Sequence, residues 1–205
     1  APHIYIGTPN RFVPQRTRFS GEPKPGINDA ILMSSRDGKT FDRWAEAFIR
    51  PGPGGAAWSN RSYYPTANTV QTSPTELSLY WNENTGRPDM RMRRGTLRID
   101  GFVSLHAGGT AGEMLSHPLT FSGDRLVINF ATSAQGSIRF ELADEAGRPL
   151  EGFALSDSED LFGNEIEQVV SWKGGSDLRR LRGRTVRLRV RLHDADLYSL
   201  RFAAE

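Results

Sequence analysis

The most regular alternation of hydrophobic and polar residues lies near the end of the chain. Apolar residues occupy every second position from Val186 to Leu192, and Arg187, Arg189 and Arg191 occupy the positions between them. Because successive side chains of a strand point to opposite faces, this pattern predicts a half-buried strand with its arginines exposed. A turn at Asp194–Asp196 and a second strand through Tyr198–Phe202 would complete an antiparallel hairpin.

Shorter apolar segments precede this hairpin in the second half of the chain. They predict strands at Leu119–Phe121, Leu126–Phe130, Ile138–Leu142 and Val169–Trp172. Residues 152–165 are polar and indicate a loop, and Ser176–Leu181 is the one candidate for a short helical turn. Residues 108–205 are therefore predicted to form an antiparallel β-sandwich.

The first half of the chain also has short apolar segments at close spacing. Strands are predicted at His3–Gly7, Ala30–Met33, Asn68–Thr72, Glu76–Trp81, Met90–Ile99 and Phe102–Leu105. Two long loops, Thr8–Gly26 and Pro51–Pro65, separate the earlier ones. Repeated antiparallel strands of this kind are typical of β-propeller blades, and residues 1–107 have room for about two, where a closed ring needs at least about four. The predicted fold class is all-β: terminal propeller blades followed by a sandwich.

A turn signal stands after the Ala30–Met33 segment, in Ser34–Phe41. Asp37-Gly38 favours a tight hairpin, because glycine adopts positive φ at little cost. The side chains of Ser35 and Asp37 are placed to bond nearby backbone amides and to close the turn. Phe41 and Trp44 would then lie on the returning strand.

Composition narrows the classes of function. The chain has 205 residues, no cysteine and a net charge of +2. Neither half is basic enough to favour nucleic-acid binding, and no apolar segment reaches membrane-spanning length. The four histidines lack the spacing of metal ligands, and no phosphate-binding glycine loop or nucleophile elbow is present. We therefore expect no metal, cofactor, nucleic-acid or membrane partner.

The pattern Ser-x-Asp-Gly-x-Thr-Phe at residues 35–41 resembles the Asp-box hairpins of β-propeller glycosidases and sialidases. With the segments Arg43–Gly52, Trp58–Arg61, Glu76–Tyr80 and Leu97–Ser104, the chain is similar to the closing part of a bacterial glycoside hydrolase family 32-like protein. That resemblance implies a five-bladed propeller followed by a β-sandwich, and a protein that acts on carbohydrate outside the cytoplasm, although the chain carries no signal peptide. It also implies a catalytic nucleophile upstream of residue 1. The family's later Arg-Asp-Pro and Glu-Cys signatures have no match here, so activity of this chain alone stays open.

Two carboxylates are the candidates for catalysis, because glycoside hydrolysis uses a pair of them. Glu46 lies between Trp44 and Phe48, an apolar setting that would raise its pKa and suit a proton donor, although it could equally pair with Arg50. Asp29 precedes a strand, where a propeller projects residues to its central funnel, or it caps a turn. Glu76 and Glu83 are expected to be solvated or paired with Arg91 or Arg93.

Candidate sugar-binding residues combine arginines with aromatic rings. They are Arg11, Arg50, Trp58, Asn60, Arg61 and Tyr63. Guanidinium groups bind carboxylates or sugar hydroxyls, and aromatic rings stack on pyranose faces. The same residue types also form structural salt bridges and fill the seams between blades.

Three interpretations follow from the sequence. The first is the C-terminal portion of a glycoside hydrolase-like enzyme, the second a non-catalytic carbohydrate-binding module, and the third a purely structural pair of β-domains. In each of them the exposed sheet edges of residues 1–107 would be covered by upstream blades or by a second chain.

Overall fold

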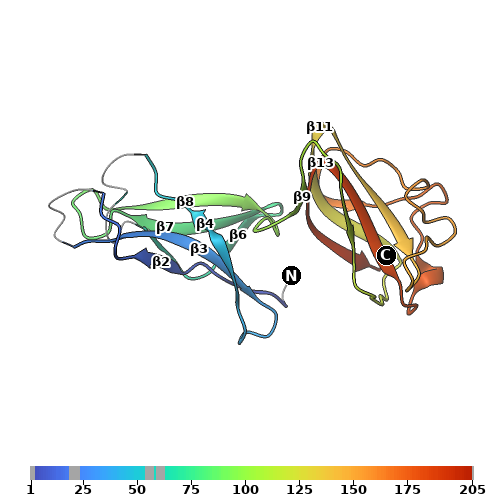
Figure 1. The fold of residues 1–205 in the computed structure, drawn as a ribbon, viewed down its shortest axis with the longest axis horizontal. Helices are drawn as coiled ribbons and strands as arrows, with labels where there is room; N and C mark the ends of the chain where they lie inside the picture. The colour runs from blue at the N-terminus through green and yellow to red at the C-terminus, as the bar shows by residue number, and fades with distance from the viewer. Residues whose placement is uncertain (1–2, 19–23, 54–57, 59–62, 205) are drawn as a thin grey trace. The chain divides into compact units, whose positions relative to one another are not determined.

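The computed structural model describes residues 3–18, 24–53, 58 and 63–204. Across these residues the chain is all-β with antiparallel sheets, as the sequence predicted. The 3₁₀ turn Arg179–Leu181 (η2) lies within the predicted helical segment Ser176–Leu181. The chain divides into two compact units, Ala1–Ile99 and Asp100–Glu205 (Figure 1).

The first sheet of the first unit is built around one central strand. Its members are β1 (Tyr5–Gly7), β2 (Asn10–Val13), β3 (Ile27–Ser35) and β4 (Asp42–Ile49). β1 and β2 pair in succession with the same edge of β3 in unbroken register, with Gly7 opposite Met33 and Asn10 opposite Ala30. β4 pairs with the other edge of β3. β2 lies within the predicted loop Thr8–Gly26. Pro9, between β1 and β2, interrupts the edge strand without ending the pairing, because its carbonyl oxygen accepts a 3.1 Å hydrogen bond from the amide of Ile31.

The second sheet repeats this plan. It contains β5 (Tyr63–Pro65), β6 (Val70–Ser73), β7 (Glu76–Glu83) and β8 (Arg91–Arg98). β5 and β6 share one edge of β7, and β8 pairs with the other edge along its whole length. β5 lies within the predicted loop Pro51–Pro65. The described part of the first unit thus holds two antiparallel sheets, fewer than the four or so blades of the smallest propeller ring.

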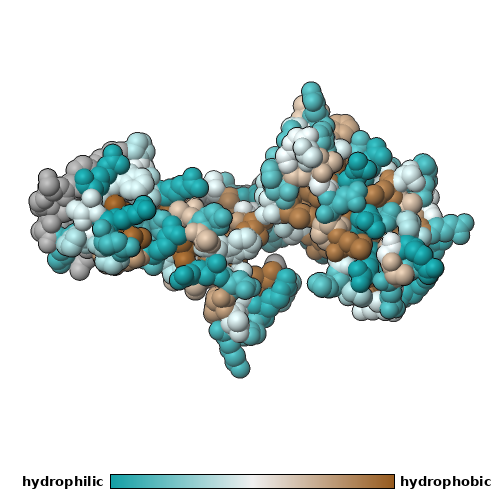
Figure 2. Space-filling model, in the orientation of Figure 1, coloured by the Kyte–Doolittle hydropathy of each residue, from teal (hydrophilic) through white to brown (hydrophobic). Residues whose placement is uncertain are grey.

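Among its described residues, the first unit buries few apolar side chains. Those below a tenth exposed are Ala30, Ile31, Leu32, Tyr63 and Leu79, while Tyr5, Phe12, Trp44, Val70, Met90 and Met92 are each more than 40% exposed. Hydrophobic residues are visible among polar ones on its surface (Figure 2). The two sheets are tied together at Tyr63, whose carbonyl oxygen accepts hydrogen bonds from the side-chain amides of Asn10 and Asn28.

The second unit is one curled sheet. It comprises β9 (Leu105–Ala107), β10 (Gly112–Leu115), β11 (Arg125–Ala143), β12 (Asn164–Val169) and β13 (Arg187–Ala203). The strand order is β10-β13-β11-β12, and β9 also pairs with β13. The two long strands lie side by side and bend together (Figure 1).

The predicted hairpin at the end of the chain is wrong in its pairing. Residues 186–192 and 198–202 do not pair with each other, because residues 187–192 and 198–202 lie in one long strand, β13 (Arg187–Ala203). Val186 directly precedes that strand. Their partners are the two halves of β11. What looks like a turn at Asp194–Asp196 is the bend of β13, where Asp194 has a φ of 45°. Leu126–Phe130 and Ile138–Leu142, predicted as separate strands, are likewise the two halves of β11. Leu119–Phe121 contributes only an isolated bridge to Val186.

A glycine allows the two long strands to bend at the same place. The register of β11 against β13 shifts between Thr132 and Ser137. A Cβ atom on Gly136 would lie 2.2 Å from the carbonyl oxygen of Asp194. Only a residue without a side chain permits so close an approach of the two backbones.

The concave side of the curled sheet encloses the core of the second unit. The largest fully buried side chains here are Leu126, Ile128, Phe130, Ile138, Phe140, Leu142, Val170, Trp172, Leu178, Leu181, Leu188 and Leu192. Trp172 donates from Nε1 to the carbonyl oxygen of Phe140 at 2.9 Å and meets the ring of Phe153 edge-on, with centroids 5.2 Å apart. Both sets of alternating residues predicted to be buried, in 138–142 and 186–192, face this core.

The predicted domain boundary between residues 107 and 108 falls inside the second unit. β9 pairs with β13, with Ala107 opposite Ala195. Asp100 accepts a hydrogen bond from Ser199, and Ser104 donates one to Asp196. The segment Phe102–Leu105 therefore does not complete a meander of the first unit, and the boundary lies at Ile99–Asp100.

Candidate functional site

The turn centred on Asp37 joins β3 to β4 and is closed by its own side chains. Oδ1 of Asp37 accepts hydrogen bonds from Ser35 Oγ and from the amides of Lys39 and Thr40, at 2.8–2.9 Å. Ser35 Oγ accepts from the amide of Gly38, whose φ is 70°. The two backbone amides and Ser35 lower the pKa of the Asp37 carboxyl to about 2. Each bond is local to the turn, so Asp37 acts here as the group that shapes the hairpin.

Arg11 and Asp29 form a two-point ion pair across β2 and β3. Nε and Nη2 of Arg11 donate to the two carboxylate oxygens of Asp29 at 2.8 and 2.5 Å, and Nη1 donates to the carbonyl oxygen of Ala45. Asp29 lies within β3 rather than at a turn, directly opposite Arg11. The pair thus binds three neighbouring strands together and raises the pKa of Arg11, chiefly through the hydrogen bond to Asp29.

Glu46 and Arg50 are both exposed, Glu46 on β4 and Arg50 just after it. Trp44, which the proton-donor hypothesis uses to desolvate Glu46, is itself 41% exposed. The buried apolar setting that the proton-donor hypothesis requires around Glu46 is therefore missing from the structure.

The predicted sugar-binding residues around the Pro51–Pro65 segment have mixed positions. Tyr63 is 3% exposed, and its hydroxyl oxygen accepts a 2.8 Å hydrogen bond from the amide of Gly52, so its ring fills the interior of the unit. Burial raises the pKa of this hydroxyl. Trp58 is half-buried; its Nε1 donates to the carbonyl oxygen of Gly52, and the guanidinium of Arg18 lies 5.7 Å from its ring centroid. Asn60 and Arg61 fall outside the described residues.

A buried carboxylate that sequence reasoning did not select as a site lies at the end of β7. Glu83 is 8% exposed and accepts hydrogen bonds from Nε of Arg91 at 2.8 Å, Nε of Arg93 at 3.0 Å and Nε1 of Trp81 at 3.3 Å. Burial by itself raises the pKa of Glu83, but the bonds from two arginines and a tryptophan outweigh it and leave the pKa below its ordinary value. The predicted pairing of Glu83 with Arg91 or Arg93 is confirmed with both, and Glu76 pairs with Arg94 instead.

The ring of Trp81 lies across the neighbouring strand. A Cβ atom on Gly95 would meet Cζ3 and Cη2 of the indole at 2.7 and 2.9 Å. Gly95 stands opposite Leu79, so the ring extends diagonally from β7 over β8. The half-buried indole has the half-exposed side chains of Arg91 and Arg93 beside it. A clue was present in the sequence: Gly95 is the one glycine in an otherwise regular strand, which often marks a close approach.

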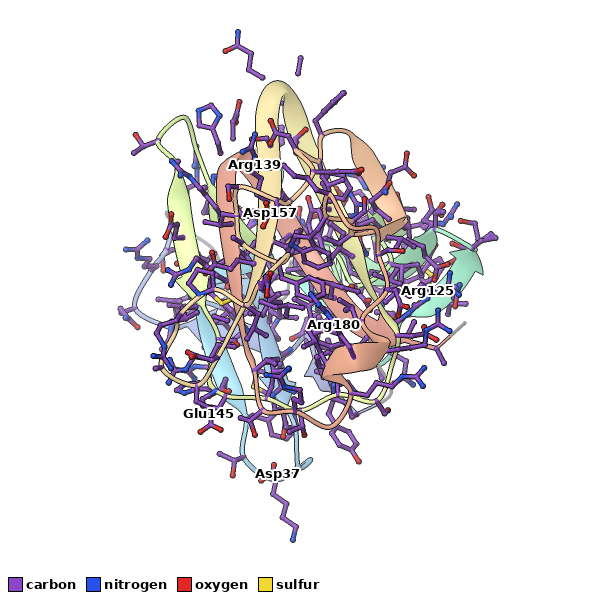
Figure 3. All side chains as sticks on the ribbon, turned by 90° about the vertical axis from the view of Figure 1, so that its right-hand side faces the viewer. Asp37, Arg125, Arg139, Glu145, Asp157 and Arg180 are labelled. Atoms are coloured by element: carbon purple, nitrogen blue, oxygen red, sulfur yellow. The ribbon has the colours of Figure 1, made fainter. Side chains whose placement is uncertain are left out.

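The second unit has a pocket of about 650 Å³ on the outer face of β11 and β13. Polar side chains supply most of its wall: Ser137, Arg139, Ser156, Arg191 and His193. Arg139, labelled in Figure 3, bonds through Nε to Asp160 at 3.0 Å. The hydrogen bonds from Arg139 and Ser137 hold the pKa of Asp160 below its ordinary range. No residue of this pocket was selected as a site from the sequence.

Among the described residues, no group of three or more histidine, aspartate or glutamate side chains is arranged to hold a metal ion. The same residues include no helix with the length and hydrophobicity needed to span a membrane. A comparison of the chain with protein-family models gave no match, and comparisons with curated proteins and with solved structures gave none either.

Proposed function

We propose that this chain is a carbohydrate-binding part of a carbohydrate-active protein, and that the surface around Trp81 receives a neutral sugar. The observation that carries the proposal is the placement of the Trp81 ring over Gly95, which holds a half-buried indole along the sheet. Aromatic rings fixed in this way offer an apolar face to the C–H groups of a pyranose.

The arginines beside the ring supply the polar half of such a site. Arg91 and Arg93 each use Nε to bond Glu83, which fixes the direction of both guanidinium groups. Their side chains remain 52% and 49% exposed. An oriented guanidinium loses little further freedom when its remaining N–H groups donate to a ligand hydroxyl.

The positions of Asp29, Glu46 and Glu83 favour a binding role of the first unit over a hydrolytic one. A glycosidase needs one protonated and one ionised carboxyl on either side of the scissile bond. Asp29 is held by Arg11, Glu83 is held by two arginines, and Glu46 is exposed. Glycosidase activity of a longer protein that contains this chain, with Glu46 as proton donor, stays a prediction, as does the covering of the first unit by further blades or a second chain.

The test is binding of cellohexaose, xylohexaose and mannohexaose, measured by titration calorimetry on the whole chain. Trp81→Ala should weaken binding of the preferred oligosaccharide at least about tenfold, equivalent to about 1.4 kcal/mol. Gly95→Ala should weaken it as well, because the added Cβ displaces the ring. Trp81→Phe keeps an apolar ring and should retain part of the affinity.

Trp44→Ala is the matched control, because Trp44 is 41% exposed on the other sheet. Thermal unfolding of each variant shows whether it remains folded. Failure of all three oligosaccharides to bind, or an equal loss in Trp44→Ala and Trp81→Ala, would refute the proposal.

A further inference from the structure

The pocket of the second unit combines cationic and hydrogen-bonding groups from two neighbouring strands. In the ladder between β11 and β13, Arg139 stands directly opposite Arg191, and Ser137 directly opposite His193. Two arginines in directly opposed positions repel each other unless an anion lies near both. The ligand chemistry therefore depends on how far acidic side chains already balance them.

The two arginines differ in their partners. Arg139 is bonded to Asp160 at 3.0 Å. The carboxylate nearest to Arg191 is that of Glu113, at 3.9 Å, which is too long for a hydrogen bond. Glu113 also lies 3.5 Å from Nη1 of Arg189. Arg191, 55% exposed in its side chain, is thus the cation with the weakest pairing in this pocket.

Around these cations the pocket has further groups suited to a sugar. Nε2 of His193 lies 3.1 Å from the carbonyl oxygen of Gly109; since a carbonyl only accepts, Nε2 carries the proton when the ring is neutral, and Nδ1 is left as an acceptor. Ser156 adds a hydroxyl, and Leu155 adds an apolar stretch of wall. The volume of about 650 Å³ is in the range of pockets for small molecules.

We propose that this pocket binds the carboxylate of an acidic sugar, a uronic acid, with Arg191 as the residue that pairs with the carboxylate. This proposal extends the carbohydrate-binding function proposed above, at a separate site. Arg139 holds the opposite side of the carboxylate, and His193 and Ser156 bond ring hydroxyls. A guanidinium without a close partner gains a charge-assisted, two-point hydrogen bond when the carboxylate enters.

Glucuronic acid and glucose are the matched probes, since they differ only in a carboxylate against a hydroxymethyl group. Changes in the amide NMR spectrum of the whole chain measure binding and show which unit responds. Glucuronic acid should perturb residues 137–139, 155–156 and 191–193, with an affinity at least about tenfold above that for glucose. Acetate is a third probe, which shows whether a bare carboxylate is enough.

Arg191→Gln should lower the affinity for glucuronic acid about tenfold or more. Arg201→Gln is the matched control, because Arg201 lies on the same strand with its side chain 60% exposed, paired with Glu167 outside the pocket. The Trp81→Ala variant should bind glucuronic acid like the unaltered chain, which separates this site from the one on the first unit.

Equal affinities for glucose and glucuronic acid would overturn the proposal, as would equal losses in Arg191→Gln and Arg201→Gln. Acetate binding as tightly as glucuronic acid would contradict the sugar part of it, and would identify a general carboxylate site. Failure of the neutral oligosaccharides to bind near Trp81 leaves these outcomes unchanged, so the two proposals can fail separately.

Discussion

Nε of Arg189 donates a 2.9 Å hydrogen bond to Oε1 of Glu141, a residue only 4% exposed. Alternation along residues 186–192 placed this arginine on the polar face of its strand, and it is there. The face is nevertheless not fully solvated at this point, because the segment after β11 covers Glu141 and the amide of Leu155 bonds its second oxygen. A position that the sequence assigns to solvent thus holds a largely buried ion pair.

Replacement of Arg189 by serine should therefore be costly. The change leaves the Glu141 carboxylate buried with one backbone donor, and we expect a loss of about 2–3 kcal/mol in the free energy of unfolding. Chemical denaturation measures it. The double variant Arg189→Ser with Glu141→Leu should recover part of the loss, since it removes the unpaired charge; no recovery would show that the pair is not the cause.

The two faces of β13 should respond very differently to substitution. Leu188 is 1% exposed, and Leu188→Asp should cost at least about 4 kcal/mol or unfold the second unit. Arg191 is exposed, and Arg191→Ser should cost less than about 1 kcal/mol. Thermal and urea unfolding of both variants tests this, and similar losses in both would contradict the orientation of the strand.

Gly136 should tolerate no side chain. Gly136→Ala brings a Cβ within 2.2 Å of the Asp194 carbonyl oxygen, and the strands must part or lose their common bend. We expect a loss of about 3 kcal/mol. Gly174→Ala is the control, since a Cβ there would meet no atom within 4 Å, and it should change stability by less than about 0.5 kcal/mol. A result of similar size for both glycines would rule out this account of the bend.

The turn centred on Asp37 should weaken only in strong acid. The pKa of Asp37 is lowered from 3.8 to about 2 in the folded chain, so its contribution is fully present above pH 3.8 and is lost as the pH falls through about 2. Carbon NMR of the Asp37 carboxyl, titrated from pH 6 to pH 1.5, measures the shift. Ser35→Ala removes one of the three hydrogen bonds and should raise the pKa toward 3.8. An ordinary pKa in the unaltered chain would contradict the bonded turn.

Two glutamates of the first unit should differ in their structural roles. Glu83→Gln removes the negative charge of a buried carboxylate that pairs with both Arg91 and Arg93. We expect the free energy of unfolding to fall by about 1.5–3 kcal/mol. Glu46→Gln alters an exposed side chain and should change stability by less than about 0.5 kcal/mol. Denaturation curves of the two variants provide the comparison. A larger loss of stability for Glu46→Gln than for Glu83→Gln would contradict the exposed position of Glu46.

Much of the local structure was predictable, because it depends on neighbours in sequence. The alternation in residues 138–142 and 186–192 identified the buried faces correctly, and the Asp37-Gly38 turn closes with the side chains expected of it. β7 and β8 lie within or close to their predicted limits, since their apolar positions and turn residues all point the same way. Pairing of Glu83 with arginines was predictable from charge and strand order.

The sites were harder to predict, since they depend on which strands become neighbours. The contact of Trp81 with Gly95 and the opposition of Arg139 and Arg191 exist only once the register of a ladder is set, and residues far apart in sequence then share one row. By residue type, Tyr63 was a plausible sugar-binding residue and Asp29 a plausible catalytic carboxylate. Tertiary packing made the first an interior ring and the second half of an ion pair.

The sequence by itself determined the all-β class, the faces of the strands and the turn at Asp37, because periodicity and turn chemistry act over a few residues. Only the tertiary structure decided that residues 187–203 form one bent strand rather than a hairpin. Two strands joined by a turn and one strand with a bend have the same alternation on either side of Asp194. The difference depends on Gly136, more than fifty residues earlier, where a missing side chain lets the neighbouring strand bend at the same point.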